Sequence, residues 1–351
     1  MRIDGARIGR YARAGARWAR LAVSRPSRAG VHVFYGHDRI PGSGEPARGG
    51  TAKFQRLAER FPNEPTRFNV LYLGSSWLPR DLGPLLGLAR RRGIPVVVNQ
   101  NGVGYPAWAG ERAEEVNRPL RRALEVAAHV LYQSEFCKAS ADRFLGEPRG
   151  SWEILPNAVD IERFTPAEAR PPGGPVLLLG GDQSQGDHRL DLALDTLAIV
   201  RREHPDAQLV VTGELAGAPD PREGVRFAGR YSQAEAPALF RSAHLLLHTQ
   251  MNDSCPSVVL EAMACGLPVV HPASGGTVEL VGGVGGIGVP HEGDWERLVP
   301  PSAGAMAEAV EKVLADLDSY SREARQRAVE RFSLGPWLDR HTELLAELTS
   351  R

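Results

Sequence analysis

Two acidic residues stand eight positions apart in the segment with the most chemical potential. Asp253 and Glu261 flank the run Ser-Cys-Pro-Ser-Val-Val-Leu, and an apolar, strand-like run at 245–248 precedes them. Pro256 and Ser257 are typical helix-start residues, and the Gly-x-Pro that follows is typical of a helix end. The sequence therefore predicts a short helix after a strand, with the first acid on the loop and the second in the helix.

Glu261 is the one charged side chain in a helix that is otherwise apolar on every side. Burying a carboxylate is costly unless hydrogen-bond donors replace the lost water. Ribose hydroxyls are suitable donors, and the free amides and positive dipole end of a helix N-terminus suit a diphosphate. Asp253, on the loop, could accept hydrogen bonds from sugar hydroxyls. The competing interpretation is a surface helix whose Glu261 faces water.

The segment 252–276 resembles the signature of retaining family 4 glycosyltransferases, in which two acids spaced eight apart precede a Gly-x-Pro-Val-Val strand. The glycine pair Gly275 and Gly276 fits the same pattern, and 155–166 is similar to the interdomain linker of that family. The resemblance covers about residues 31–345. It implies an α/β protein of the GT-B fold, with two Rossmann-like domains whose parallel sheets face each other across a cleft.

The resemblance also implies a role for each matching residue. Glu261 would hold the nucleotide ribose and Asp253 the transferring sugar, which makes Asp253 a catalytic candidate. Gly49 and Gly50 would let the backbone approach the donor phosphates closely. Donor contacts are also expected from five residues of the loop and first helical turn: Ser254, Cys255, Pro256, Ser257 and Val258. The family needs no metal, so we expect neither a metal nor a cofactor.

Three departures separate this chain from the family pattern. Asp253 replaces the usual Glu, which shortens the side chain by one methylene. The lysine that usually contacts the diphosphate is missing. Arg189 is the best replacement, because arginine binds phosphate bidentately. The competing interpretation is that Arg189 is an ordinary residue of the first helical turn. Arg230 is a further candidate near the base or phosphate. Where many relatives have a histidine, this chain has Asn101, an amide that can bind a sugar hydroxyl but cannot take a proton; it stays among the catalytic candidates.

Short apolar runs alternate with helical stretches along the chain. Strands are expected at 31–35, 70–73, 95–98, 130–132, 176–179, 208–212, 245–248 and 268–271. Apolar strands with long crossovers indicate parallel sheets, and two such sets in series indicate two Rossmann-like domains. We expect an N-terminal acceptor-side domain (1–157) with a basic arm (1–30), a linker (158–174), a C-terminal nucleotide-sugar-binding domain (175–332) and a helix that crosses back onto the N-terminal domain (333–351).

The charge balance excludes one class of function. The 42 basic residues equal the 42 acidic ones, so nothing in the total favours nucleic-acid binding. The three cysteines form no CxxC pair, which fits a reducing cytosol. The arm 1–30 is basic. Four of its arginines recur at helical spacing, with apolar residues, Trp18 and Leu21 among them, interspersed. It is either an amphipathic helix on an anionic bilayer or a solvated arm, so we expect a cytoplasmic protein with peripheral contact at the inner membrane face left open.

These observations predict a metal-independent, retaining glycosyltransferase that moves a sugar from a nucleotide-sugar donor to a hydroxyl acceptor. The acceptor could be a glycan, a lipid-linked sugar or a natural product. The alternative, which the missing lysine and histidine favour, is a non-catalytic GT-B scaffold that binds a sugar nucleotide or a partner protein. A nucleotide-sugar epimerase shares the fold but is a weaker interpretation, because the linker and the acidic pair match transferases.

Overall fold

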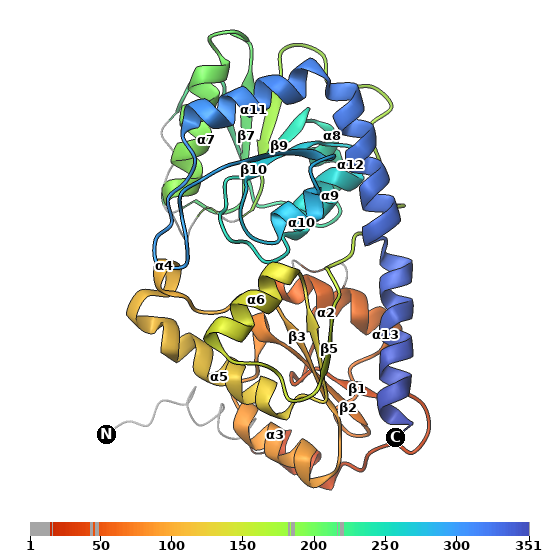
Figure 1. The fold of residues 1–351 in the computed structure, drawn as a ribbon. Coiled ribbons are helices and arrows are strands. Elements are labelled where there is room, and N and C mark those ends of the chain that lie inside the picture. The colour runs from red at the N-terminus through yellow and green to blue at the C-terminus, as the bar shows by residue number, and fades with distance from the viewer. Residues whose placement is uncertain are drawn as a thin grey trace, which may run out of the picture.

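The computed structural model of the chain describes residues 15, 17–42, 45, 49–181, 183, 187–215, 217 and 221–350. It contains two α/β domains, one at each end of the molecule, and each is built on a parallel sheet (Figure 1). The predicted linker, 158–174, lies between the last strand of the first sheet and the first strand of the second. Among the described residues, no helix has the length and apolarity that a membrane span requires.

The N-terminal domain has a sheet whose strand order follows the chain, β1-β2-β3-β4-β5. Its strands are β1 (Val33–Phe34), β2 (Val70–Gly74), β3 (Val96–Gln100), β4 (His129–Tyr132) and β5 (Ser151–Ile154). Its helices are α2 (Gly49–Arg60), α3 (Leu82–Arg91), α4 (Pro106–Ala109), α5 (Ala113–Val126) and α6 (Glu135–Phe144), with 3-10 turns η1 (Ser75–Trp77) and η2 (Gly110–Arg112).

The two faces of this sheet carry different helices. On one face α3, α5 and α6 pack against the core that contains Leu71 and Val98. On the other face Phe54 and Leu57 of α2 pack against Tyr72. The strands are parallel and follow one another in chain order, while α2 lies on the opposite face from the other three helices. The β1–α2–β2 connection therefore has the opposite hand to the three that follow it. This places α2 alone among these crossover helices on its face of the sheet.

The C-terminal domain has the strand order β11-β10-β9-β6-β7-β8, which reverses between β6 and β9. Its strands are β6 (Val176–Leu179), β7 (Gln208–Thr212), β8 (Val225–Gly229), β9 (Leu245–Leu247), β10 (Val269–Pro272) and β11 (Gly286–Val289). Its helices are α7 (Asp187–Val200), α8 (Ala236–Arg241), α9 (Ser257–Ala264), α10 (Thr277–Val281), α11 (Ala303–Ala315) and α12 (Leu317–Phe332). The reversal is the place where doubly wound sheets bind ligands.

The last helix, α13 (Leu334–Thr349), leaves the C-terminal domain and runs along the N-terminal domain (Figure 1). Trp337, Leu344 and Leu345 are buried there, in the same core as α2. The two crossings of the chain between the domains pair with each other, since Val159 N donates to Phe332 O over 2.8 Å and accepts, through its carbonyl, from Leu334 N over 3.0 Å. The helix that crosses back is therefore part of the N-terminal core.

The sequence missed three strands, and each lies at a sheet edge or carries little apolar surface. β5 and β8 are edge strands with exposed residues in their pattern, so no continuous apolar run marks them. β11 is the other edge of the second sheet and reads Gly-Ile-Gly-Val. The eight strands that were expected all coincide with observed ones to within a few residues.

The described part of the basic arm packs on the N-terminal domain. Residues 17–23 are helical, Leu21 is buried in the core, and Trp18 packs beside it. Arg17 donates to the Gly36 carbonyl over 2.8 Å and to Asp81 over 3.1 Å. The expectation of a fully solvated arm is therefore wrong for this stretch, and these two apolar side chains face the protein itself. Residues 1–14 lie outside the described residues.

Candidate functional site

The carboxyl ends of both sheets meet at the interface between the domains. After β4, Ser134 Oγ donates over 2.7 Å to the carbonyl of Ser254, which follows β9. Glu279 of α10 accepts from the backbone amides of Glu135 and Phe136, at the start of α6, over 2.7 and 2.8 Å. Asn157 Nδ2 donates to the Cys255 carbonyl over 2.9 Å. The interface thus brings together the strand ends where ligands of such folds bind.

The glycine pair is needed for the loop that carries the first acid. Gly276 N donates to the Asp253 carbonyl over 2.8 Å. A Cβ added at Gly276 would overlap the Ser254 carbonyl oxygen, and one added at Gly275 would lie 2.5 Å from the Asp253 carbonyl oxygen. Gly275 also has φ +67°, a conformation that glycine adopts without strain. The backbone after β10 therefore holds the backbone after β9 in place.

Asp253 lies half-buried on this loop, as predicted. Its Oδ1 accepts from Cys255 N at 3.4 Å. The preceding Asn252 has φ +54°. Tyr105 of the N-terminal domain lies close by: burial raises the pKa of its hydroxyl to about 12, a hydrogen bond with Asn252 lowers it, and the charge of Asp253 raises it further. The first acid therefore lies on a loop of the C-terminal domain beside Tyr105 of the N-terminal domain.

Glu261 is buried in α9, with 4% of its surface exposed. The competing interpretation, a surface helix whose Glu261 faces water, is therefore wrong. Burial raises the pKa of this carboxyl from its usual 4.5 to about 7, against the opposing effects of Arg56, of Arg163 and of a hydrogen bond with Gln233. Arg56 Nη2 lies 3.4 Å from Glu261 Oε1. A buried carboxylate with so few donors suits a ligand that supplies more.

The first turn of α9 lies at the reversal of strand order. Its cap position is occupied by Pro256, and no side chain caps the helix in the described part of the chain. A Cβ added at Gly180, after β6, would overlap the Val258 side chain, so the loops after β6 and β9 touch here. Ser257 begins the helix. The Cys255 side chain is turned toward Asn157, whose backbone N donates to its Sγ over 3.2 Å. Burial raises the pKa of this thiol to about 12.

The N-terminal candidates are held by contacts within their own domain. Gly49 and Gly50 open α2, and a Cβ at Gly50 would overlap the Ser76 side chain. Close packing of α2 on η1 therefore suffices to explain Gly50. Asn101 N donates to Ser75 Oγ over 2.9 Å, and Ser75 Oγ donates back to Asn101 Oδ1.

The structure describes the side chain of only one of the two candidate cations for the diphosphate, Arg189 and Arg230. Arg189 is in the first turn of α7, but its side chain lies outside the described residues, so its role stays a prediction. Arg230, after β8, forms an exposed ion pair with Glu214, after β7. Both of these strand ends lie on the side of the sheet that faces the N-terminal domain. Arg230 therefore remains a candidate for contacting the base or diphosphate, although its guanidinium is paired with Glu214.

Lys53 of α2 is a cation that the motif pattern did not identify. It is 5% exposed, and its Nζ donates to Asn99 Oδ1 over 2.6 Å. Gln133 shares that acceptor over 2.7 Å. Burial lowers the pKa of Lys53 to about 8, while Cys255 and Cys137 oppose the shift. The rarity of lysine, at three positions in 351 residues, was a signal, together with its place four residues after Gly49.

Trp295 of the C-terminal domain makes an aromatic contact with the N-terminal domain. Trp295, in the loop after β11, stacks on Phe136 with ring centroids 4.9 Å apart and packs edge-on against Tyr105 and Phe144 of the N-terminal domain. Its carbonyl accepts from Ala107 N over 2.9 Å. In Figure 1 this loop descends from the C-terminal domain to α4. The loop after β11 thus makes a further contact between the two domains.

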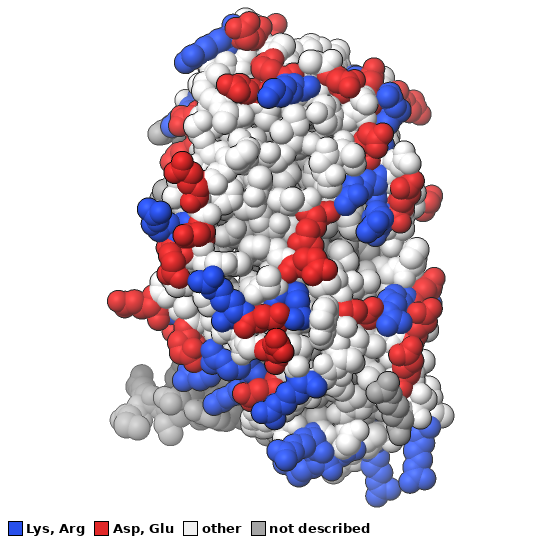
Figure 2. Space-filling model, viewed as in Figure 1, with Lys and Arg blue, Asp and Glu red and all other residues white. Residues whose placement is uncertain are grey.

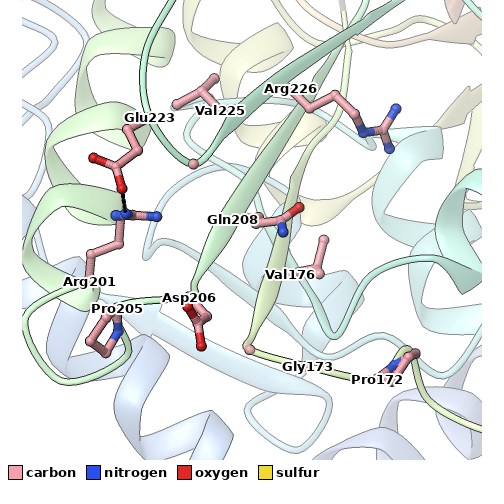
Figure 3. A pocket seen from close by; sticks show the side chains of 12 residues that line it. Pro172, Gly173, Val176, Arg201, Pro205, Asp206, Gln208, Glu223, Val225 and Arg226 are labelled. Atoms are coloured by element: carbon pink, nitrogen blue, oxygen red, sulfur yellow. Dashed lines mark hydrogen bonds and ion pairs between the residues drawn. The ribbon is translucent and has the colours of Figure 1, made fainter.

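A surface cavity of about 570 Å³ lies elsewhere in the C-terminal domain (Figure 3). Val176, Gln208 and Val225, the first residues of β6, β7 and β8, line it. Arg201 and Glu223 at its rim form an ion pair with an N–O distance of 2.6 Å. The cavity therefore lies at the amino ends of the strands, opposite the end at which parallel sheets bind ligands, and we do not assign the donor to it.

Charged side chains are unevenly spread over the face drawn in Figure 2. Lys and Arg gather at the end of the N-terminal domain that lies away from the C-terminal domain, while much of the upper domain's face is uncharged. Within the described residues, no three histidine, cysteine or carboxylate side chains gather as they would around a metal ion.

Comparison with known proteins agrees with this architecture. The sequence profile of the family described as "Glycosyl transferases group 1" matches residues 174–316, most of the C-terminal domain. The structure of Anabaena Alr3699/HepE in complex with UDP-glucose superposes with a TM-score of 0.68 at 17% identity, covering 91% of this chain and 100% of that one. The fold is GT-B, as the resemblance implied, with one parallel α/β domain on each side of the interface.

Sequence relatives point in the same direction. The D-inositol 3-phosphate glycosyltransferase of Salinispora arenicola is 31% identical over 245 residues, which cover 58% of this chain and 54% of that protein. The glycogen synthase of Mycobacterium tuberculosis is 26% identical over 260 residues, covering 69% of this chain and 60% of that protein. The chain thus spans between half and two thirds of the length of these curated relatives.

Proposed function

We propose that this protein is a glycosyltransferase that moves a sugar from a nucleoside diphosphate sugar to a hydroxyl acceptor. One observation carries the proposal: a buried carboxylate, Glu261, lies in the helix that begins where the strand order reverses. Buried carboxylates require donors, and ribose hydroxyls are donors that a nucleotide at this point of the sheet supplies.

The proposed roles follow the geometry. Glu261 accepts hydrogen bonds from the ribose, the uncapped amides of Ser257 and Val258 face the diphosphate, and Asp253 binds hydroxyls of the transferring sugar. Stabilising negative charge on the departing diphosphate is then the main electrostatic task. We propose retention and metal independence on the strength of the family resemblance, with the leaving diphosphate, rather than the amide of Asn101, helping to deprotonate the acceptor.

A uridine diphosphate sugar is the first donor to test, because Alr3699/HepE was crystallised with UDP-glucose. The acceptor stays open among glycans, lipid-linked sugars and natural products. A cytoplasmic location is part of the proposal. So is peripheral membrane contact through the basic arm 1–30, apart from Trp18 and Leu21, which pack on the protein. Loss of binding to anionic vesicles on deletion of residues 1–14 would support that contact, and no binding by the full chain would contradict it.

Nucleotide binding and donor turnover test the proposal separately. UDP, GDP, ADP or TDP should raise the melting temperature, and Glu261→Ala should abolish most of the shift. Glu308→Ala, on the exposed face of α11, is the matched control and should keep it. Mass spectrometry of nucleotide-sugar hydrolysis, with and without EDTA, then reports turnover without a known acceptor.

The outcomes separate the proposal from its alternatives. No shift with any of the four nucleotides contradicts a nucleotide-sugar site. A shift without hydrolysis or transfer across many acceptors favours the non-catalytic scaffold. Conversion of the donor sugar into its epimer, with the nucleotide still attached, would instead identify an epimerase.

A further inference from the structure

One face of α2 is cationic and turns toward other parts of the molecule. Lys53, Arg56 and Arg60 are spaced three and four residues apart, so they share that face. Arg60 Nη2 lies 3.5 Å from the carboxylate of Asp339 in α13. Arg56 reaches the C-terminal domain and the linker. This helix thus contacts the C-terminal domain, the linker and α13.

Arg56 makes two contacts outside its own domain. Its Nη2 lies 3.4 Å from Glu261 Oε1, and its Nη1 donates to the carbonyl of Ala158 in the linker segment. The side chains of Arg56 and Glu261 are 15% and 5% exposed. Among the ion pairs of the described residues, this one joins a helix of the N-terminal domain to the carboxylate assigned to ribose. It can form only while the domains are closed on each other.

The groups around Glu261 are mostly neutral. From the C-terminal domain, Gln233 donates a hydrogen bond to the carboxylate, and Tyr231 and Cys265 lie close enough for its charge to raise their pKa values. Arg163, in the linker segment 158–174, supplies a cation. Arg56 is the named cation that comes from the opposite domain.

The helices packed against α9 carry further charged side chains, but these are not among the groups that shift the pKa of Glu261. Arg325 of α12 donates through Nη1 to the carbonyls of Ala264 and Phe164, and through Nη2 to that of Ile161. Glu279 of α10 is occupied by the amides at the start of α6. Arg241 of α8 donates to the Pro237 carbonyl. The ionisation of Glu261 therefore depends chiefly on burial, Arg163 and Arg56.

Resting on the proposed function, we propose that Arg56 is a positioning residue for the donor nucleotide. Closure of the N-terminal domain brings its guanidinium to Oε1 of Glu261, which favours the ionised carboxylate as the acceptor for the ribose hydroxyls. Ribose binding and domain closure are then coupled through one carboxylate, and by linkage each strengthens the other. The residue acts through Glu261 and touches no reacting atom.

The pH dependence of nucleotide affinity tests this role. UDP binding is measured by calorimetry from pH 6 to 9 for wild type, Arg56→Gln and Arg56→Lys. Ionisation of the UDP phosphate affects all three proteins equally, so it cancels when their affinities are compared at each pH. Wild-type affinity should rise with pH through about 7. Arg56→Gln should lower the affinity at pH 7 by about three- to tenfold, a factor of ten corresponding to one pKa unit. It should approach wild type by pH 9, and Arg56→Lys should restore much of the wild-type profile.

Two controls keep the result interpretable. Arg60→Gln removes the neighbouring cation of the same helix face and should leave the pH profile unchanged. Glu261→Gln should flatten the profile, because the amide does not titrate, and this holds even if Arg56→Gln fails to fold.

Each contrary outcome has a distinct meaning. If wild type binds no nucleoside diphosphate, the proposed function fails. If wild type binds UDP but Arg56→Gln weakens it equally at every pH, or not at all, the positioning role is overturned while the function stands. A profile that survives Glu261→Gln also overturns it, because another group then titrates.

Discussion

The two sheets of this protein are built from the same kind of strand but wound differently. The C-terminal sheet reverses its order between β6 and β9, whereas the N-terminal sheet runs in chain order from β1 to β5. The reversal by itself creates a crevice for a ligand, and the acidic segment lies there. In the N-terminal domain the corresponding feature is a helix, α2, on the face opposite to α3, α5 and α6. The comparison indicates that strand topology places the proposed donor site, while α2, on the opposite face of its sheet, connects the N-terminal domain to it.

The domains also differ in how complete each one is. The C-terminal cores are formed by helices of that domain, from α7 to α12. The N-terminal core that contains α2 depends on α13, which comes from the far end of the chain. His341 of α13 is fully buried, and one of its ring nitrogens lies 3.0 Å from the Tyr72 hydroxyl. The domain that carries α2 therefore lacks part of its core without α13.

Truncation after Gly335 should give the largest effect. It removes Trp337, Leu344 and Leu345 from the N-terminal core, and loss of each such side chain costs about 2–5 kcal/mol. Amide hydrogen exchange should show lost protection in α2, β1 and β2, with the C-terminal domain still protected. Truncation after Thr349 is the control and should change neither domain. Equal loss in both domains would contradict the asymmetry between them.

Gly276→Ala should have the next largest effect, centred on the loop after β9. An added Cβ would also lie 2.7 Å from Ser134 Oγ of the N-terminal domain. The added methyl overlaps the Ser254 carbonyl, so the loop carrying Asp253 must move. We expect a loss of about 2–4 kcal/mol of stability and a fall in donor hydrolysis of about 100-fold.

The control for this change is another glycine of the same domain. Gly304, in α11, has its nearest neighbour 3.9 Å from an added Cβ, so Gly304→Ala should be neutral or slightly stabilising. Unchanged hydrolysis in Gly276→Ala would show that the loop position does not matter for the donor.

Lys53→Met should give the smallest and most pH-dependent effect. Burial lowers the pKa of Lys53 to about 8 from the usual 10.5, so the folded state loses its proton before the unfolded state does. The cost of burying the charge, up to about 3 kcal/mol, is complete below pH 8 and disappears as the pH rises to 10.5. The variant should therefore be more stable than wild type at pH 7, and the gap should close toward pH 10 in denaturant titrations.

Lys312→Met, on the exposed side of α11, is the control for the removal of a lysine and should show no such trend. A stability gap for Lys53→Met that stays constant with pH would mean that Lys53 carries no buried charge.

The helix that carries Glu261 could be predicted from the sequence because the residues that start, fill and end it are close together in the chain. Glu261 in an apolar helix, the proline that precedes α9 and the glycine that follows it all lie within a few residues of one another, so periodicity and capping rules identify them. Edge strands such as β5 escaped because half-exposed residues break the apolar run. The arm at 17–23 escaped for a related reason: an apolar stripe shows that a helix needs a partner surface, but not whether that surface is lipid or protein.

The sequence alone therefore determined the acidic pair, the helix that carries its second member, the glycine pair and the parallel α/β character of both domains. The tertiary structure decided the strand orders, the face on which α2 lies, the burial of Lys53 and the contact of Arg56 with Glu261. The two partners in that contact are 205 residues apart. Which cation reaches a buried carboxylate depends on how two separately folded domains meet, and no local pattern of residues records that geometry.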